Sequence, residues 1–184
     1  MKKILLTSTG FDNKKFEELF VSNVGKPINI VKVLLVPTAA YDDESRSVIP
    51  FCRQDLTNAG VLDENVIDYD LDRPMEYEEL IQYDAIYFCG GSEVVLMEAI
   101  NRVEFASVLL QAVDKGLFYI GVSAGSMIAS TSVENNLGII NNPLEPHCEE
   151  NITPCGALPP AGEPVNISDN QAVWITDDKI EIIE

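Results

Sequence analysis

The sequence predicts an α/β fold built on a doubly wound, mostly parallel sheet that ends in a C-terminal β-hairpin. Over the first 130 residues, aliphatic strand-like segments alternate with helix-like ones, and each strand-like segment ends in small or polar residues. This alternation is typical of parallel sheets with helices on both faces. With 184 residues, of which 46% are apolar, the chain is long enough for one compact domain, and we expect a single domain over 1–184.

The expected elements follow one another regularly along the first part of the chain. The segments 2–9 and 28–40 are aliphatic or β-branched, as buried parallel strands are. The segment 13–24 carries Phe16, Leu19 and Phe20 at helical spacing. In all, strands are expected over 2–9, 28–40, 65–71, 84–91 and 117–123, and helices over 13–24, about 44–60, 75–82, 93–102 and about 104–115. Ligands of such sheets bind in the crevice beyond the carboxyl ends of the strands.

The chain changes in character after residue 131 and becomes rich in Asn, Pro and Gly. One short strand is expected there, over 137–141. The sequence "QAVWIT-DD-KIEII" then predicts an antiparallel hairpin with its turn at Asp177 and Asp178.

The charge of the chain argues against several classes of partner. Lys and Arg number 12 and Asp and Glu 30, which gives a formal net charge of −18. Such a charge repels phosphate backbones and anionic lipid surfaces, so we expect neither nucleic acid nor a membrane as partner. The opening "MKKILLTSTGFDNKK" has too short an apolar run for a signal peptide, and we expect a cytoplasmic protein.

The cysteines predict neither a disulfide framework nor a metal centre. Cys52, Cys89, Cys148 and Cys155 are scattered through a chain with enough apolar residues for a core, so reduced thiols are expected. Cys148 and Cys155 lie near His147 in the sequence, but neither a second His nor a close Cys pair completes a zinc pattern. Phosphate-loop motifs are also absent from the sequence, and we expect no cofactor and no metal.

The stretch "FYIGVSAGSMIAS" contains the pattern G-x-S-x-G, with Ser123 between Gly121 and Gly125. A strand-like run precedes it and a helix-like run follows, which is the context of a nucleophile elbow. Free N–H groups at the start of the following helix could stabilise an oxyanion there. The alternative is a bend of small residues that serves packing alone.

A serine nucleophile needs a base, and His147 is the one histidine of the chain. The pair Ser123 and His147 is therefore the predicted catalytic dyad. For the carboxylate that orients the imidazole, Glu134 ranks first, because it lies between the elbow and the histidine. Glu145, Glu149 and Asp169 are the alternatives.

The segment "YFCGGSEVVLMEA" ends a strand with Gly90 and Gly91 and opens a helix. Paired glycines permit close approach of the backbone, and one of their N–H groups could join that of Ala124 in an oxyanion hole. A simple strand-to-helix turn is the competing interpretation.

Taken together, these motifs resemble the peptidase E family of serine peptidases, which includes aspartyl dipeptidases and cyanophycinases. The resemblance rests on "LLTST", "VPTAA", "YFCGGSEVVLMEAI", "YIGVSAGSMI", the "PH" that follows and "SDNQAVWIT". It implies a flavodoxin-like sheet similar to class I glutamine amidotransferase domains, and a single catalytic domain without cofactor. It also implies that Ser123 is the nucleophile, His147 the base, and Gly91 with Ala124 the oxyanion donors.

The leading functional hypothesis is a serine hydrolase that cleaves an amide bond in small peptides. Residues 116–178 contain eight acidic residues and no Lys or Arg, which disfavours strict specificity for an aspartyl side chain. The alternatives are a catalytically silent relative that acts as a binding or regulatory domain, and an esterase. Exposed sheet edges often pair, so a homodimer is a further expectation.

Overall fold

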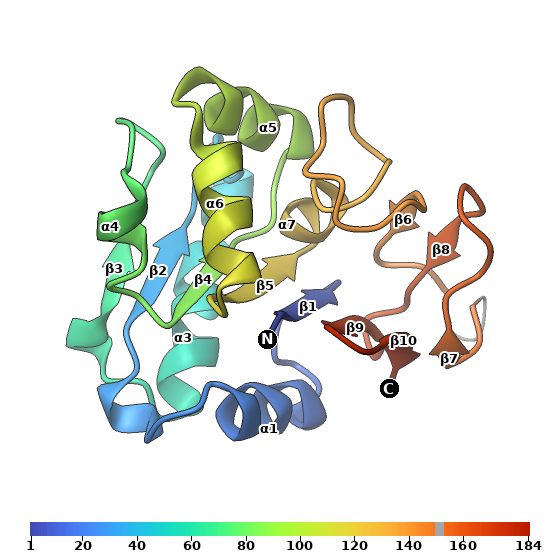
Figure 1. Ribbon diagram of the computed structural model, residues 1–184, viewed down its shortest axis with the longest axis horizontal. Helices are drawn as coiled ribbons and strands as arrows, with labels where there is room; N and C mark the ends of the chain where they lie inside the picture. Colours follow the sequence, from blue (N-terminus) through green and yellow to red (C-terminus); the bar gives the residue numbers. More distant parts are fainter. Residues whose placement is uncertain (150–152) are drawn as a thin grey trace.

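A computed structural model describes residues 1–149 and 153–184 of the chain (Figure 1). Its eight-stranded sheet has the order β3-β2-β4-β5-β1-β9-β10-β7, and a separate parallel pair joins β6 to β8. The strands are β1 (Lys3–Thr7), β2 (Val33–Val36), β3 (Val66–Asp68), β4 (Ala85–Phe88), β5 (Phe118–Val122), β6 (Leu144–Glu145), β7 (Gly156–Ala157), β8 (Val165–Asn166), β9 (Ala172–Thr176) and β10 (Ile180–Ile183). The helices are α1 (Lys14–Asn23), α2 (Asp43–Arg46), α3 (Ile49–Asn58), α4 (Tyr77–Leu80), α5 (Glu93–Arg102), α6 (Phe105–Asp114) and α7 (Ala124–Met127), with 3-10 turns η1 (Ile28–Ile30) and η2 (Asp63–Asn65).

The sheet confirms the predicted fold class. Strands β3, β2, β4, β5 and β1 are parallel, and β9, β10 and β7 continue the sheet in antiparallel pairing. The order β3-β2-β4-β5 repeats the 2-1-3-4 order of flavodoxin-like sheets, and β1 takes the next place. The predicted hairpin is formed by β9 and β10. In Figure 1 the C-terminal strands, in orange and red, lie to the right of β1, opposite β3 and α4.

The sheet separates two apolar layers. On one face, Phe16 and Phe20 of α1 and Leu56 of α3 pack with Leu5 of β1. On the other face, α5, α6 and α7 cover side chains such as Ile4 of β1. Neighbouring residues of β1 thus point to opposite layers, as the pleat of a strand requires, and a strand buried on both sides shows the continuous apolar run seen in the sequence.

Three expected elements differ from the structure. The prediction of a strand over 137–141 is wrong. The N–H of Leu137 donates to Ile128 O (2.8 Å), and the N–H groups of Ile139 and Ile140 donate to Ala129 O. This segment therefore binds the carbonyl groups that follow α7 and does not pair as a strand. The paired residues are those of β6 and β8.

The other two differences concern element length. The expected helix 44–60 is divided into α2 and α3, because Pro50 lies in the first turn of α3, where its missing N–H is tolerated. The expected strand 28–40 contains η1 before β2 begins at Val33. In the described residues, no helix is both long and apolar enough to cross a membrane.

Candidate active site

Ser123 stands on a sharp turn between β5 and α7, with φ 49° and ψ −105°. This is an unfavourable backbone conformation for a residue with a Cβ, and the surrounding structure must hold it in place. The N–H of Ser123 donates to Thr7 O (2.9 Å), and the Ser126 hydroxyl donates toward the carbonyl oxygens of Thr7 and Gly121 (2.7 and 2.8 Å). Neighbouring β1 and the first turn of α7 therefore fix the elbow from both sides.

Both glycines of the G-x-S-x-G pattern are required for steric reasons. A Cβ on Gly121 would collide with the Gly125 carbonyl, and a Cβ on Gly125 would collide with Phe88 of β4. The backbone of α7 can lie this close to β4 and β5 only when both positions lack a side chain. The pattern is thus the local requirement of the turn that presents Ser123.

Ser123 and His147 line the same cavity, which has a volume of about 940 Å³. The cavity lies at the carboxyl ends of the parallel strands, where the segments after β1, β2, β4 and β5 meet. In the described part of the chain, the Ser123 hydroxyl makes no hydrogen bond, so its oxygen remains available to a ligand in the cavity.

His147 is held by contacts on both its backbone and its ring. Its backbone is left-handed (φ 59°), and its N–H donates to the hydroxyl of the buried Ser8 (3.1 Å). Its Nδ1 lies 2.8 Å from Oδ1 of Asp169. A carboxylate at Nδ1 favours the tautomer with the proton on Nδ1, which leaves Nε2 as an acceptor.

Asp169, and not Glu134, is the carboxylate that the structure places on His147. Glu134 lies in an exposed turn after α7 and has no contact with the imidazole. Glu145 is in β6, where its carbonyl accepts from Ile167 N (2.9 Å), and its carboxylate makes no contact with His147; nor does Glu149 among the described residues. The pairing of β6 with β8 brings the two loops together, and this long-range pairing is invisible in the spacing of the sequence.

Gly90 and Gly91 lie in the cavity beside Ser123. A Cβ on Gly90 would be 3.4 Å from Ser123 Cβ, and a Cβ on Gly91 (φ 136°) would overlap the Ala39 carbonyl. Within the described residues the Gly91 N–H has no hydrogen-bond partner. Ala124 is the first residue of α7, so its N–H has no partner within the helix.

Asp55 and Tyr87 also line the cavity, although no pattern in the sequence indicates them as site residues. The Tyr87 hydroxyl donates to Oδ2 of Asp55 (2.6 Å), and Phe11 N donates to the same oxygen (2.9 Å). Burial raises the pKa of Asp55 to about 6, against the opposing effect of these two hydrogen bonds. In the sequence, Asp55 is one polar position of an amphipathic helix, and Tyr87 is one residue of a buried strand.

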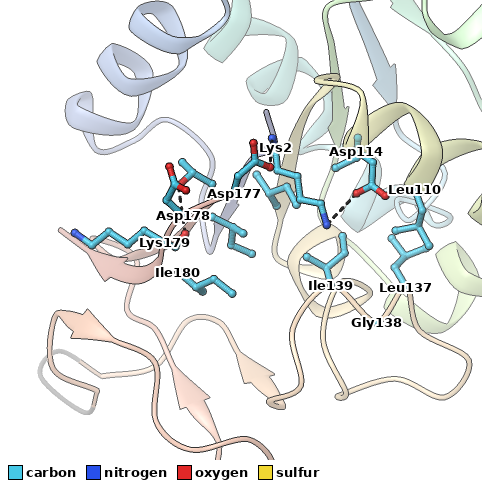
Figure 2. A pocket seen from close by; sticks show the side chains of 14 residues that line it. Lys2, Leu110, Asp114, Leu137, Gly138, Ile139, Asp177, Asp178, Lys179 and Ile180 are labelled. Carbon is cyan, nitrogen blue, oxygen red and sulfur yellow. Dashed lines mark hydrogen bonds and ion pairs between the residues drawn. The ribbon is translucent and has the colours of Figure 1, made fainter.

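A second cavity of about 560 Å³ lies at the amino end of β1 (Figure 2). It is bordered by α6, residues 137–139 and the β9–β10 turn, and Lys2 Nζ lies 2.9 Å from Asp114 Oδ1 at its wall. The described lining includes no Ser, Cys or His, so this cavity offers neither an activated hydroxyl nor an imidazole.

The cysteines and acidic residues form no metal centre in the part of the chain that the structure describes. No three His, Cys, Asp or Glu side chains gather there in a way that could hold an ion. All four cysteines are free.

An elbow serine at the carboxyl edge of a doubly wound sheet, with a His–Asp pair in the same cavity, defines the class of α/β proteins that present a serine on a strand-to-helix turn. Within that class, the family model of peptidase family S51 matches residues 4–183, and the chain belongs to this family. The resemblance to peptidase E is thereby confirmed.

Similar proteins agree with this membership. The chain is 28% identical over 137 residues to an uncharacterized peptidase of Pasteurella multocida (strain Pm70). The aligned region spans 73% of the chain and 63% of that protein. It is 29% identical over 135 residues to an uncharacterized peptidase of Listeria monocytogenes serovar 1/2a, covering 72% and 63%. The matched part of the chain thus spans less than two thirds of the length of these two relatives.

Solved structures share the fold. A Listeria monocytogenes EGD-e protein described as a peptidase E superposes with a TM-score of 0.77 at 21% identity, covering 100% of this chain and 98% of that one. A peptidase from an acI-B1 Actinobacterium superposes with a TM-score of 0.71 at 18% identity, covering 100% and 87%. At these identities the likeness establishes the sheet and its connections.

Proposed function

We propose that this chain is a serine peptidase that hydrolyses an amide bond in small peptides. The observation that carries the proposal is the presence, in one cavity, of an elbow serine with an unbound hydroxyl and of a histidine whose Nδ1 lies 2.8 Å from a carboxylate. Membership of a peptidase family supports the choice of an amide over another acyl compound.

In the proposed reaction, Ser123 Oγ attacks the scissile carbonyl while His147 Nε2 takes the hydroxyl proton. The tetrahedral oxyanion forms near the N–H groups of Gly91 and Ala124, with Gly90 giving room for the close approach. His147 then gives the proton to the leaving amine, and water attacks the acyl-enzyme by the same base catalysis. Asp169 orients the imidazole and stabilises its charged form.

Labelling with a fluorophosphonate probe tests the nucleophile directly. We expect the wild-type chain to be labelled in a single position and Ser123→Ala to remain unlabelled, because the probe reacts with activated serines. His147→Ala should lower the labelling rate by at least tenfold through the loss of the base. The exposed Ser22 lies on α1, away from the cavity, and Ser22→Ala is the matched control.

Two outcomes would contradict the proposal. Equal labelling of wild type and Ser123→Ala would place the reactive group elsewhere. A folded wild-type chain that is never labelled would favour the catalytically silent relative. If it is labelled, turnover of dipeptide amides beside the matching esters separates a peptidase from an esterase.

A further inference from the structure

The cavity that contains Ser123 is strongly anionic. Among its twenty lining residues in the described part of the chain, none is Lys or Arg and five are acidic: Asp12, Asp42, Glu44, Asp55 and Glu93. His147 is the one lining residue that could carry a positive charge, and its Nδ1 is already next to Asp169. An anionic substrate group would therefore enter against the field of its surroundings, and a cationic group would be attracted.

Asp55 is partly exposed, and among these five carboxylates it is the one that accepts hydrogen bonds from other elements of the fold in the described part of the chain. Its Oδ2 accepts from Tyr87 and from Phe11 N, and Gly10 has no room for a Cβ between the Asp55 carboxylate and the Tyr87 hydroxyl. Three segments, α3, β4 and the chain after β1, thus fix one orientation of this side chain. A carboxylate fixed in this way is preorganised for a ligand.

The charge of Asp55 is not balanced by the protein. Both of its hydrogen-bond donors are neutral groups, and its Oδ1 has no partner in the described residues. Arg53, on the same helix, is engaged elsewhere, with Asp63 and Asp68 (3.0 and 2.7 Å). A partly buried carboxylate without a cation is costly, and a positively charged ligand would remove that cost.

The wall beside Asp55 suits the hydrocarbon part of a cationic group. Val48 and Phe51 of the α2–α3 region and Tyr41 after β2 line the cavity, and the rings of Tyr41 and Phe51 are exposed. Apolar and aromatic surface can cover an alkyl stem, and an aromatic face attracts an ammonium or guanidinium group.

We propose that the cavity selects substrates with a positive charge on the residue that supplies the scissile carbonyl, and that Asp55 is the specificity residue that receives this charge. The inference rests on the proposed function of Ser123 and adds the substrate class to it. The shared chemistry is an ammonium or guanidinium cation, which the substrate can carry as its α-amino group or at the end of its side chain. Burial raises the pKa of Asp55 to about 6, so its carboxyl is mostly ionised at pH 7, and a bound cation would stabilise that form further.

Four amides with one fluorogenic leaving group test the proposal at pH 7, where an α-amino group is still mostly protonated: those of lysine, norleucine, Nα-acetyl-lysine and Nα-acetyl-norleucine. Norleucine has nearly the shape of lysine without the side-chain charge, and acetylation removes the α-ammonium charge. We expect kcat/KM to be at least tenfold higher for the lysine amide, which carries both charges, than for the neutral Nα-acetyl-norleucine amide. Comparison of the norleucine and Nα-acetyl-lysine amides shows which of the two positions carries the effective charge.

Asp55→Asn should reduce the ratio of kcat/KM between the preferred cationic amide and the neutral amide by at least fivefold, because an amide cannot neutralise the cation. Glu18→Gln, on the exposed side of α1, removes the same charge outside the cavity and should keep the wild-type ratio. Should Asp55→Asn fail to fold, protection of wild-type Ser123 from fluorophosphonate by n-pentylamine, with n-pentanol as neutral control, tests the same preference.

The outcomes distinguish this inference from the proposed function. Equal kcat/KM for all four amides, or a higher value for the matching aspartyl amide, would overturn the selection of cations while leaving Ser123 as the nucleophile. A lost preference in Glu44→Gln as large as in Asp55→Asn would overturn the assignment to Asp55. Absence of both turnover and labelling would remove the proposed function itself.

Discussion

At the scale of residues, the candidate site depends on a contact between two loops. His147 and Asp169 are 49% and 60% exposed at their side chains, so solvent partly screens the 2.8 Å interaction between them. We therefore expect Asp169 to act mainly by orienting the imidazole, and to contribute less to the rate than a buried carboxylate of a serine protease does.

Asp169→Asn should lower kcat about 10- to 1,000-fold, because an asparagine amide can present either a donor or an acceptor to Nδ1 and no longer fixes the tautomer. Glu134→Gln is the control, since Glu134 has no contact with His147 in the structure. Steady-state kinetics of both variants with one peptide amide give the comparison. A larger loss in Glu134→Gln than in Asp169→Asn would contradict the observed pairing.

Single residues could be predicted from the sequence where their chemistry needs local spacing. Ser123 is flanked by the glycines that its turn requires, and His147 is the one histidine of the chain. In the sequence Asp169 is one of three alternatives ranked below Glu134, and no pattern indicates Asp55, because their positions depend on the pairing of β6 with β8 and on the packing of α3 against β4. With 30 acidic residues in the chain, residue type alone could not single them out.

At the scale of elements, the turns that follow β4 and β5 contain Gly90, Gly91 and Ser123 of the candidate site. Both turns need glycine for steric reasons, and this need explains why the sequence pattern marked them well. The segment 137–141 has the apolar composition of a strand, but its N–H groups bind carbonyls after α7. Composition predicts burial of such a segment and does not determine its hydrogen-bond partner.

Gly91→Ala should destabilise the chain strongly, because residue 91 has φ 136° and the new methyl group would overlap the Ala39 carbonyl. We expect a loss of about 2–4 kcal/mol in the free energy of unfolding. Gly138→Ala is the matched control: its φ is also positive, at 65°, but no atom lies within 4 Å of the added methyl. The control should lose about 1 kcal/mol.

Urea denaturation of both variants measures the difference. Similar losses would mean that the positive φ alone determines the loss in the free energy of unfolding, and that the turn after β4 can move away from Ala39. A variant of Gly91 that stays folded should also label more slowly at Ser123, since its N–H is one of the proposed oxyanion donors.

At the scale of the whole molecule, charge repulsion opposes folding. The formal net charge is −18, and the ion pairs among the described residues mostly involve exposed side chains, which contribute little to stability. Salt shortens the range of this repulsion from about 30 Å at 0.01 M to about 8 Å at 0.15 M.

Raising NaCl from 0.01 M to 0.3 M should therefore increase the midpoint of urea denaturation. The relief of long-range repulsion should outweigh the weakening of a few surface ion pairs. Potassium chloride at the same ionic strength should give the same shift, because the effect is one of screening. A midpoint that falls with salt would show that the ion pairs outweigh the repulsion.

The order of the strands along the chain also affects how the molecule is made. The elbow is complete once β5 and α7 have been synthesised, and β1 can already pair with β5 at that stage. Strand β9, which pairs with β1, and Asp169 just before it are made more than forty residues after Met127, the last residue of α7. During synthesis one edge of β1 therefore stays unpaired until β9 has been made. The turn that presents Ser123 can thus form before His147 and Asp169 have been synthesised, and the contact between His147 and Asp169 is completed only late in the synthesis of the chain.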